Sequence, residues 1–566
     1  MGKFFAGEAT AENIGFLKIW ENLVLRSAPG RRVKARARPR LPGEEKELEN
    51  DLEEIVSVRK LWDTYPDLFE RLCNVLESVK DPFYAIALLK DEKPLSSAEL
   101  FVVGHLAFTV TRVLSILKEI GIEGFPPRTI PPSLKDLERR LLPGSAGQPA
   151  FYVSDSYSPE LSRVRAERKN KEKMWRAEMT KEAQAVERLL GRRPGLREEI
   201  AIRKTSADLI EKARLMPELG EIRETVTHVH FRLKATAEAV KLEREINRLR
   251  QREIALEEEV ISTLSREVHA KLGEIEGAAQ ALGELDFLLA KVELARRWRA
   301  VKPAIVETSG RVLFLEDAFH PEVKEEVESR GGRYQPVSVE IDSGVSVITG
   351  PNMGGKTVTL ATVGLCVALA QWGLLVPCRA MRFSLYDYIY FQPQTGEKPG
   401  LSSFAVEIVS LKEPLSRIHE RGLVLLDEVG RGTNPAQGLA LYAALLSYFM
   451  ENDKKGSTII ATTHYHGLAS MLGVPHWQVT GLVPSQDDLQ DLGERWINGA
   501  RDIKWLYEHM DYRLQKVGPD TPTPQDALLV ARVLGLEEEV VRKAEDFYLL
   551  GRGFQEGVRG SASSRN

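Results

Sequence analysis

The sequence predicts an α/β domain in its C-terminal third and a mostly helical region before it. Short apolar runs follow Pro303 and are bounded by glycine or polar residues, as in "SVSVITG", "GLVLLDE" and "STIIATTH". Runs of this kind are typical of buried strands in a parallel sheet. Upstream, apolar residues recur at three- and four-residue spacing in stretches such as "LWDTYPDLFERLCNVL", which is typical of amphipathic helices.

Changes in composition and a proline-rich segment divide the chain into five expected regions. The segment "FPPRTIPPSL" is too rich in proline for a helix interior and predicts a seam between domains. The expected regions are a helical N-terminal region at 1–124, a Pro-rich linker at 125–150, a helical core or lever region at 151–300, the α/β domain with C-terminal helices at 301–550, and a flexible tail at 551–566.

Charge and cysteine content restrict the classes of function. The 566 residues carry a formal net charge of -4, so any contact with nucleic acid must use local basic patches. Cys73, Cys366 and Cys378 are far apart and lack metal-ligand spacing, which predicts buried structural thiols, no zinc site and a reducing compartment. The N-terminus has no continuous apolar core and no later run reaches transmembrane length, so we expect a cytoplasmic protein that does not bind membranes.

Two segments before the α/β domain allow alternative interpretations. The basic run "RRVKARARPR", Arg31 to Arg40, precedes the acidic run "GEEKELENDLEE"; a self-neutralising surface is the favoured reading, and a phosphate-binding arm is the alternative. Farther on, an approximate heptad broken by Glu253 predicts a long, narrow helix pair. Such a pair can serve as a lever or form the wall of a bundle. The heptad residues are Leu242, Ile246, Leu249, Leu256 and Val260.

A glycine-rich turn predicts the binding of nucleotide phosphates. The stretch "VITGPNMGGKT" satisfies G-x-x-x-x-G-K-[ST], with an apolar strand before it and an apolar helix after it. Backbone amides of such a turn point at phosphate oxygens, Lys356 reaches the outer phosphates, and the Thr357 hydroxyl ligates Mg²⁺. We therefore expect ATP and Mg²⁺ as cofactors. The expected nucleotide-binding residues are Gly350, Pro351, Asn352, Met353, Gly354, Gly355, Lys356 and Thr357.

Polar side chains at the ends of two later strands complete a candidate catalytic site. "LVLLDE" ends in Asp427, which we expect to hold the Mg²⁺ shell, and Glu428, which we expect to orient or polarise the attacking water. "TIIATTH" ends in His464, where an imidazole meets the γ-phosphate side of the site. Each strand end alone is unspecific, and the combination with the glycine-rich turn favours catalysis.

The motifs "TGPNMGGKT", "LVLLDEVGRGT" and "ATTHYH", in this order and spacing, resemble the ATPase domain of the MutS family, a branch of the ABC-type ATPases. The resemblance implies an α/β P-loop ABC-type ATPase domain at the C-terminus, preceded by a mostly α-helical core and lever region. "GLSSFAVEI" is similar to the family segment G-x-S-T-F-x-x-E-M, which implies that Ser402 is delivered across a dimer to the γ-phosphate bound by the other subunit.

The resemblance also implies partners and marks departures from the family pattern. "DALLVARVLGLEEEVVRKAEDF" is similar to the family's dimerisation helices, so a homodimer, or a heterodimer with a related subunit, is expected. The Phe-x-Glu motif of mismatch readers and a nuclease-like tail are not found. "GEKPG" replaces two acidic residues before the serine segment, and Gln515 takes the place of a histidine near the adenine. Tyr334 is either an aromatic that stacks on adenine or an ordinary loop residue.

Three hypotheses for the use of ATP follow. The favoured one is an ATP-dependent DNA-binding clamp of the repair or recombination type, without mismatch reading, whose helical levers close on duplex or branched DNA. The alternative is an ATP-driven remodelling factor for a protein client, such as a reactivase for a cobalamin-dependent amino-acid mutase. A nucleotide-switched scaffold without a substrate of its own is the third.

Overall fold

The computed structural model divides the chain into two compact units built from interleaved segments. Unit 1 comprises Met1–Asn74, Ile116–Ile130 and Leu282–Asn566, and unit 2 comprises Val75–Ser115 and Pro131–Ala281. The structure describes residues 6–143, 151–194, 199–306, 312–342, 344–351, 354–392, 403–465, 467–483, 505, 509–518 and 526–548.

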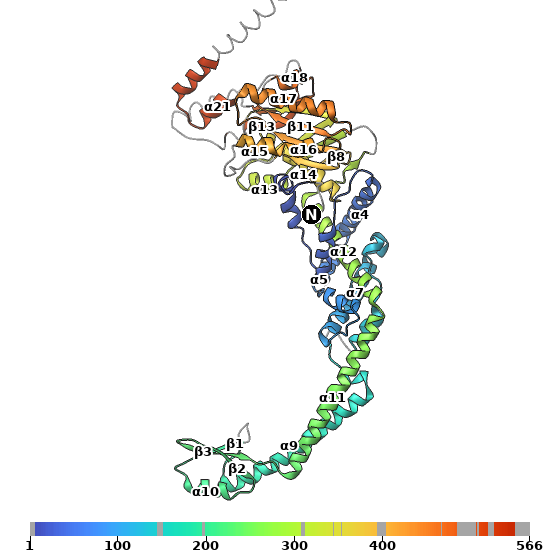
Figure 1. The fold of residues 1–566 in the computed structure, drawn as a ribbon, viewed down its shortest axis with the longest axis vertical. Helices are drawn as coiled ribbons and strands as arrows, with labels where there is room; N and C mark the ends of the chain where they lie inside the picture. The colour runs from blue at the N-terminus through green and yellow to red at the C-terminus, as the bar shows by residue number, and fades with distance from the viewer. Residues whose placement is uncertain are drawn as a thin grey trace, which may run out of the picture. The chain divides into compact units, whose positions relative to one another are not determined.

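The centre of unit 1 is a six-stranded, mostly parallel sheet, as the apolar runs predicted (Figure 1). Its strands lie in the order β13-β12-β7-β11-β10-β9, and only β13 runs antiparallel to its neighbour. Because the other five strands are parallel, their carboxyl ends meet at one edge. The strands are β7 (Gly344–Thr349), β9 (Tyr388–Phe391), β10 (Gly422–Asp427), β11 (Thr458–Thr463), β12 (His476–Leu482) and β13 (Met510–Lys516).

Helices cover both faces of this sheet. Helix α14 (Lys356–Gln371) packs on one face, where a side chain at Gly364 would collide with Leu425 of β10. On the other face, Val424 and Leu426 share an apolar core with Tyr442 of α17. Residues alternate between the two faces along β10, so burial on both sides explains its unbroken apolar run. The helices on this second face are α15 (Ser403–Ser410), α16 (Lys412–Ser416), α17 (Pro435–Asn452) and α18 (Leu468–Leu472).

A second sheet of unit 1 has the order β4-β8-β5-β6 and mixed strand directions. Alternating burial of Val337, Val339 and Ile341 places one side of β6 in the core. Its strands are β4 (Ala304–Ile305), β5 (Val312–Ala318), β6 (Val337–Asp342) and β8 (Ala380–Phe383). Helices α13 (Pro321–Ser329) and α21 (Asp526–Val533), and a helix at 538–548, complete the described part of this region.

The first helices of the chain pack directly on the α/β domain, a contact that no sequence motif indicated. The Thr10 hydroxyl accepts a hydrogen bond from the Phe391 backbone N–H at 3.1 Å, at the end of β9. Ile14 lies against Gly364 of α14, and the rings of Trp20 and Trp372 are 4.6 Å apart. The other helices that belong wholly or partly to unit 1 include α1 (Glu8–Asn13), α2 (Phe16–Glu21), α3 (Ala28–Arg36), α4 (Glu45–Thr64), α5 (Pro66–Glu77) and α12 (Leu272–Trp298).

The opposed charge blocks near the N-terminus partly neutralise each other, as the favoured interpretation expected. Arg38 donates hydrogen bonds to Glu44, and Arg40 donates to Asp51 at 2.8 Å. On α3, Arg31, Arg32 and Arg36 are exposed, whereas Lys34 is half-buried and donates to the Glu21 carbonyl at 3.1 Å. The C-terminal half of the basic run therefore anchors the start of α4.

Where the Pro-rich linker was expected, the structure places helical turns. Residues Pro127–Thr129 form the 3-10 helix η2, and Lys135–Leu141 form α8. Leu134, Leu137 and Leu141 recur at helical spacing and are buried, and the boundary between the two units falls between Ile130 and Pro131 within this segment.

Unit 2 contains the predicted helix pair (Figure 1). Helices α9 and α11 pack along each other, and Glu253, which interrupts the heptad, accepts hydrogen bonds from Arg165 at 3.0 Å and Arg168 at 2.7 Å. The break in the apolar pattern is thus an ion-pair site between the two helices. The helices of unit 2 include α6 (Phe83–Lys90), α9 (Pro159–Leu190), α10 (Ala207–Leu215), α11 (Ala237–His269) and most of α7 (Ser97–Ile120).

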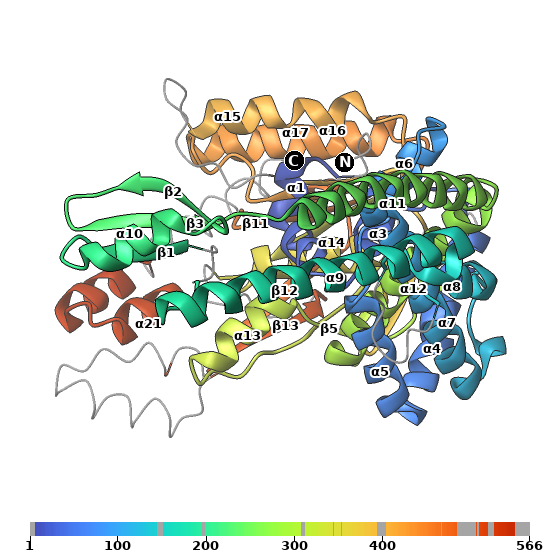
Figure 2. The ribbon, with the colours of Figure 1, turned by 90° about the horizontal axis from the view of Figure 1, so that it is seen from below.

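A three-stranded antiparallel sheet lies between α9 and α11 in the chain (Figure 2). One face of this sheet is buried through residues such as Ile202 and Phe231, which share an apolar core with the end of α9 and with α10. The other face carries the polar side chains. The strands are β1 (Glu199–Arg203), β2 (Leu219–Glu224) and β3 (His228–Leu233), in the order β1-β3-β2.

Two expectations about the whole chain have different outcomes. All three cysteines are free and buried, and burial raises the pKa of the Cys378 thiol to about 12, as expected of structural thiols. The expectation that no run reaches transmembrane length is wrong by length and composition, because α7 has a window of mean hydropathy 1.9. That window is 61% buried inside the structure, so α7 has the burial of a core helix.

A half-buried lysine on α12 predicts a pH-dependent contribution to stability. Desolvation lowers the pKa of Lys291 from 10.5 to about 8, so the folded chain binds this proton less tightly than the unfolded chain. Lys291→Met should therefore raise the free energy of unfolding by about 1–3 kcal/mol at pH 7, and this gain over wild type should shrink as the pH increases from about 8 to 10.5. Urea unfolding followed by tryptophan fluorescence measures both effects.

The exposed Lys46 of α4 supplies the matched control, because its ammonium group is in contact with water in both the folded and the unfolded chain. That variant should keep the wild-type dependence of stability on pH. A Lys291→Met variant that is less stable than wild type at pH 7, or whose gain over wild type stays the same from pH 8 to 10.5, would contradict the argument.

Candidate functional site

The glycine-rich turn joins β7 to α14 at the carboxyl edge of the six-stranded sheet. Gly355 adopts a left-handed conformation, with φ +75°, immediately before the first residue of α14. A side chain at this position would lie 2.9 Å from Cδ1 of Tyr512, and one at Gly354 would lie 2.9 Å from the Pro351 carbonyl oxygen. Both positions therefore require glycine, which leaves the backbone open to a ligand.

The Lys356 ammonium group lies inside this turn. It donates hydrogen bonds to the carbonyl oxygens of Gly350 at 2.8 Å and Pro351 at 2.9 Å, and Oε1 of Glu428 is 3.1 Å away. Lys356 is 5% exposed, so the ammonium is held within the turn by these oxygens. Strand order brings Lys356 and Glu428 together although 72 positions separate them in the sequence.

Asp427 ends β10 and binds two threonine hydroxyls. Thr357 donates to Oδ2 of Asp427 at 2.6 Å, and Thr462 of β11 donates to Oδ1 at 2.6 Å. A hydroxyl and a carboxylate at this distance are hard oxygen ligands of the kind that Mg²⁺ prefers, so the pair fits the expected cation. Within the described ranges, no group of three or more His, Cys, Asp and Glu residues could hold a metal ion.

Thr462 is a site residue that the sequence analysis missed. Its pairing opposite Asp427 in the parallel register of β10 and β11 places its hydroxyl at the carboxylate. The only sequence signal was its position near the end of "TIIATTH", where polar residues are common.

Glu428 has a strained backbone and two cationic neighbours. Its φ is +51°, a left-handed conformation that residues other than glycine rarely adopt. Its Oε1 faces Lys356, and its Oε2 lies 3.2 Å from the Arg431 guanidinium. Strain of this kind persists where surrounding contacts hold the residue, and it concentrates at functional sites.

The remaining predicted residues lie nearby or outside the described chain. His464 directly follows β11 at the carboxyl edge, is exposed, and has its ring 4.2 Å from that of Tyr465. Asn352, Met353 and Ser402 lie outside the described residues.

Tyr334 precedes β6, and its hydroxyl accepts a hydrogen bond from the His320 backbone N–H at 3.0 Å. The adjacent Gln335 bonds to the backbone of β13, donating to the Met510 carbonyl at 3.0 Å and accepting from the Tyr512 N–H at 2.8 Å. Tyr512, which no motif indicated, lies against Gly355. Tyr334, through its neighbour Gln335, and Tyr512 are thus both connected to β13, and the Tyr512 ring borders the glycine-rich turn.

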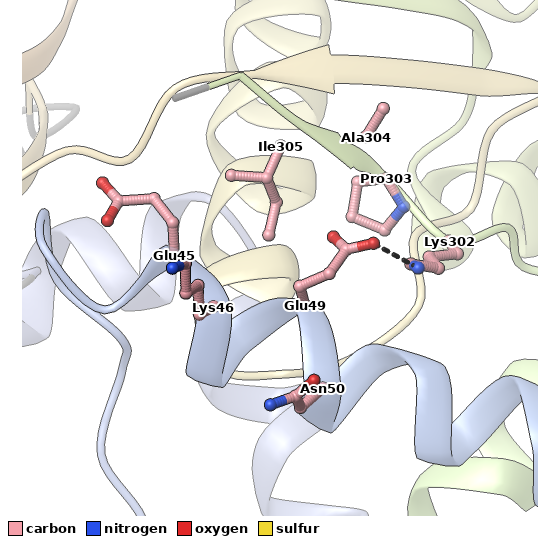
Figure 3. A pocket seen from close by; sticks show the side chains of 8 residues that line it. All are labelled: Glu45, Lys46, Glu49, Asn50, Lys302, Pro303, Ala304 and Ile305. Carbon is pink, nitrogen blue, oxygen red and sulfur yellow. Dashed lines mark hydrogen bonds and ion pairs between the residues drawn. The ribbon is translucent and has the colours of Figure 1, made fainter. Parts of the chain in front are cut away.

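A cavity elsewhere in unit 1 is not a better candidate site. It has a volume of about 520 Å³ and is lined by the start of α4 and by Lys302–Ile305 (Figure 3). Lys302 pairs with Glu49 and Glu53, so its charge is already neutralised. None of the predicted site residues lines this cavity.

The open face of the three-stranded sheet in unit 2 forms a basic surface. Cross-strand pairing places Arg203 opposite His228, and Arg223 opposite His230. Arg232 pairs with Glu199 at 2.5 Å, whereas Arg203 and Arg223 make no ion pair with any described residue. We call Arg203, Arg223, Arg232, His228 and His230 the basic sheet face.

Comparison with known proteins assigns the α/β domain to a family. Residues 346–484 match the description MutS domain V, and this range contains the glycine-rich turn, Asp427, Glu428 and His464. This match and the relatives below show that the α/β domain is similar to that of the MutS family.

The relatives carry the name Endonuclease MutS2. The protein of Staphylococcus epidermidis (strain ATCC 35984) is 34% identical over 229 residues, and that of Staphylococcus aureus (strain Mu3) is 35% identical over 229 residues. Each match covers 40% of this chain and 28% of the relative. The similarity therefore concerns about a quarter of each relative's length.

Proposed function

We propose that the chain is an ATP-dependent DNA-binding protein that hydrolyses ATP in a P-loop, ABC-type site at the carboxyl edge of its parallel sheet. The observation that carries this proposal is the meeting of Lys356, Thr357, Asp427 and Glu428, which come from two distant motifs. The match to MutS domain V supports it, because the matched range includes all four residues.

Each residue has a role that follows from its position. Lys356 exchanges its bonds to the turn for the outer phosphates, and Thr357 and Asp427 hold Mg²⁺ together with phosphate and water oxygens. Mg²⁺ supplies charge neutralisation at the phosphates. Glu428 orients or polarises the attacking water, and His464 approaches the γ-phosphate side.

The adenine is expected beside β13. Tyr334 is the proposed stacking residue, and Tyr512 is a second aromatic at the same border of the site. The Gln335 side chain, which joins the loop of Tyr334 to the backbone of Tyr512, supports a shared location for both rings.

A dimer completes the proposed site. The family resemblance assigns Ser402 to the γ-phosphate of the other subunit. The exposed apolar side chains of the C-terminal helices support a partner there, because Phe547 is 73% exposed and Leu536 and Val540 are also exposed. A homodimer is the simplest arrangement, and a heterodimer with a related subunit uses the same surfaces.

DNA is the molecule on which the proposed ATP-driven conformational change acts. The basic sheet face is the surface proposed to contact it. Arg203 and Arg223 are exposed and make no ion pair with any described residue, although Glu199 lies close enough to interact electrostatically with Arg223, so both guanidinium groups can bind phosphates. Such contacts read no sequence and must weaken as salt rises, because each neutralised phosphate releases counterions. A clamp that holds DNA without reading mismatches needs this type of surface.

The double variant Arg203→Ala/Arg223→Ala should bind duplex DNA more weakly and with a smaller salt dependence. The slope of log affinity against log salt should fall in magnitude by about 2, one for each lost phosphate contact. Fluorescence anisotropy with a labelled duplex, measured across a salt series, gives both quantities.

Arg214→Ala is the matched control, because Arg214 already pairs with Glu221 at 2.9 Å. It should leave the slope nearly unchanged. A wild-type chain that binds no duplex or branched DNA at low salt would contradict the DNA role and direct attention to a protein client.

A further inference from the structure

A buried chain of hydrogen bonds links the end of β9 to both sides of Glu428. Gln392 directly follows β9, and its Oε1 accepts a hydrogen bond from the Asp427 backbone N–H at 3.1 Å. Its Nε2 donates to Oε1 of Glu407 at 2.8 Å. The same glutamate oxygen accepts the backbone N–H of Gly430 at 3.0 Å.

The positions of these bonds indicate what they hold. Asp427 is the residue before Glu428 and Gly430 is two residues after it, so the chain fixes the backbone on both sides of the strained residue. Gln392 is 6% exposed and Glu407 is 7% exposed. Buried hydrogen bonds to backbone amides of this kind are costly to break, because an unpaired buried amide loses its solvation.

Glu407 also connects this backbone to a second part of the proposed site. It lies in α15, whose first residue, Ser403, directly follows Ser402. A shift of α15 would therefore be transmitted through Glu407 to Gln392 and Gly430. Burial raises the pKa of Glu407, and its bonds from Gly430 and Gln392 act in the opposite direction.

We propose that Gln392 and Glu407 are positioning residues for ATP hydrolysis, which hold the Asp427–Gly430 turn in register with the helix that follows Ser402. This inference rests on the proposed ATPase function. Neither side chain is required to touch the nucleotide. Their role is to keep Glu428 in its left-handed conformation and to couple that conformation to the segment offered to the partner subunit.

The isosteric variant Gln392→Glu tests the proposal, because it replaces the amide donor by a second carboxylate facing Glu407 at about the same separation. Two adjacent carboxylates cannot both ionise, so they must share a proton or separate. At pH 8 we expect kcat to fall roughly 10- to 100-fold with KM for ATP within about twofold of wild type. At pH 6 most of this loss should be recovered, because the pair can then hold a proton.

A charge-exchanged double variant gives an independent test. In Gln392→Glu/Glu407→Gln the carboxylate and the amide trade places, so the two side chains can again form a donor–acceptor pair, but the amide nitrogen that faces position 392 cannot accept the Gly430 N–H. Its kcat at pH 8 should lie between those of wild type and Gln392→Glu, because the Gly430 N–H has lost its acceptor, and its pH profile should parallel that of wild type, because no pair of carboxylates remains. The control Gln251→Glu, on the exposed face of α11, should change neither kcat nor its pH dependence.

The possible results distinguish failure of the positioning role from failure of the proposed ATPase function. If the wild type hydrolyses ATP and Gln392→Glu has the same kcat and pH profile, the positioning role is wrong. The same conclusion follows if Gln392→Glu loses activity equally at pH 6 and pH 8 and the double variant is no more active than Gln392→Glu at pH 8. If the wild type does not hydrolyse ATP, the proposed function fails first. Should Gln392→Glu not fold, the double variant carries the test.

Discussion

Glu428→Gln is expected to lower kcat for ATP hydrolysis by roughly 10² to 10³, while ATP binding is retained. The carboxylate at this position is the proposed group that orients or polarises water, and the amide that replaces it cannot accept a proton. Both carboxylate oxygens of Glu428 face cations, Lys356 and Arg431. Removing that charge frees Lys356 for phosphate, so ATP affinity should be equal to or higher than that of wild type.

Steady-state hydrolysis and equilibrium binding of a labelled ATP analogue distinguish the two effects. The control Glu413→Gln changes an exposed glutamate of α16 and should leave both unchanged. Wild-type turnover in Glu428→Gln would remove Glu428 from its proposed role. Loss of ATP binding would instead mean that Glu428 supports the fold of the turn.

Ser402→Ala should reduce turnover to a similar extent, and its effect should depend on which subunit carries it. If Ser402 acts on the nucleotide of the other subunit, a mixture of Ser402→Ala and Glu428→Gln chains should regain activity. The mixed dimer then has one site with an intact Glu428 and an intact Ser402. Random exchange of equal amounts should give about one quarter of wild-type activity, because half of the dimers are mixed and each has one intact site.

Hydrolysis by the separate variants and by their equimolar mixture, after subunit exchange, measures this directly. The two variants alone set the baseline, and pull-down of one variant through an affinity tag on the other confirms that mixed dimers form. A mixture of the two variants that stays at the baseline would show that Ser402 acts within its own subunit or does not act at all.

The local features of the site could be predicted from the sequence because they depend on short patterns. The glycine-rich turn needs residues that accept left-handed backbone, as at Gly355, and the apolar runs before Gly350 and Asp427 need only to be buried on both faces. Once the strands are known to be parallel, the meeting of Thr357 with Asp427 follows, because both motifs end at one edge of the sheet.

The long-range contacts could not be predicted because they depend on register and packing. Thr462 reaches Asp427 only through the pairing of β10 with β11, and Tyr512 reaches Gly355 from an edge strand whose sequence has no motif. Gln392 has no pattern that distinguishes it from a surface residue, and Glu407 matches the glutamate of the segment G-x-S-T-F-x-x-E-M, which does not indicate what that glutamate contacts. Glu253 likewise interrupts the heptad in the sequence, and only the structure shows that it forms ion pairs with Arg165 and Arg168 of α9.

The measurement that tests the central claim most directly is ATP hydrolysis by the purified wild-type chain with Mg²⁺, with and without duplex DNA at low salt. Lys356→Ala, which removes the ammonium from the glycine-rich turn, serves as the blank. We expect hydrolysis that the blank lacks, and a rate that DNA changes and that high salt returns to its DNA-free value. A wild-type rate no higher than that of Lys356→Ala, or one that no DNA alters at any salt, would contradict the account.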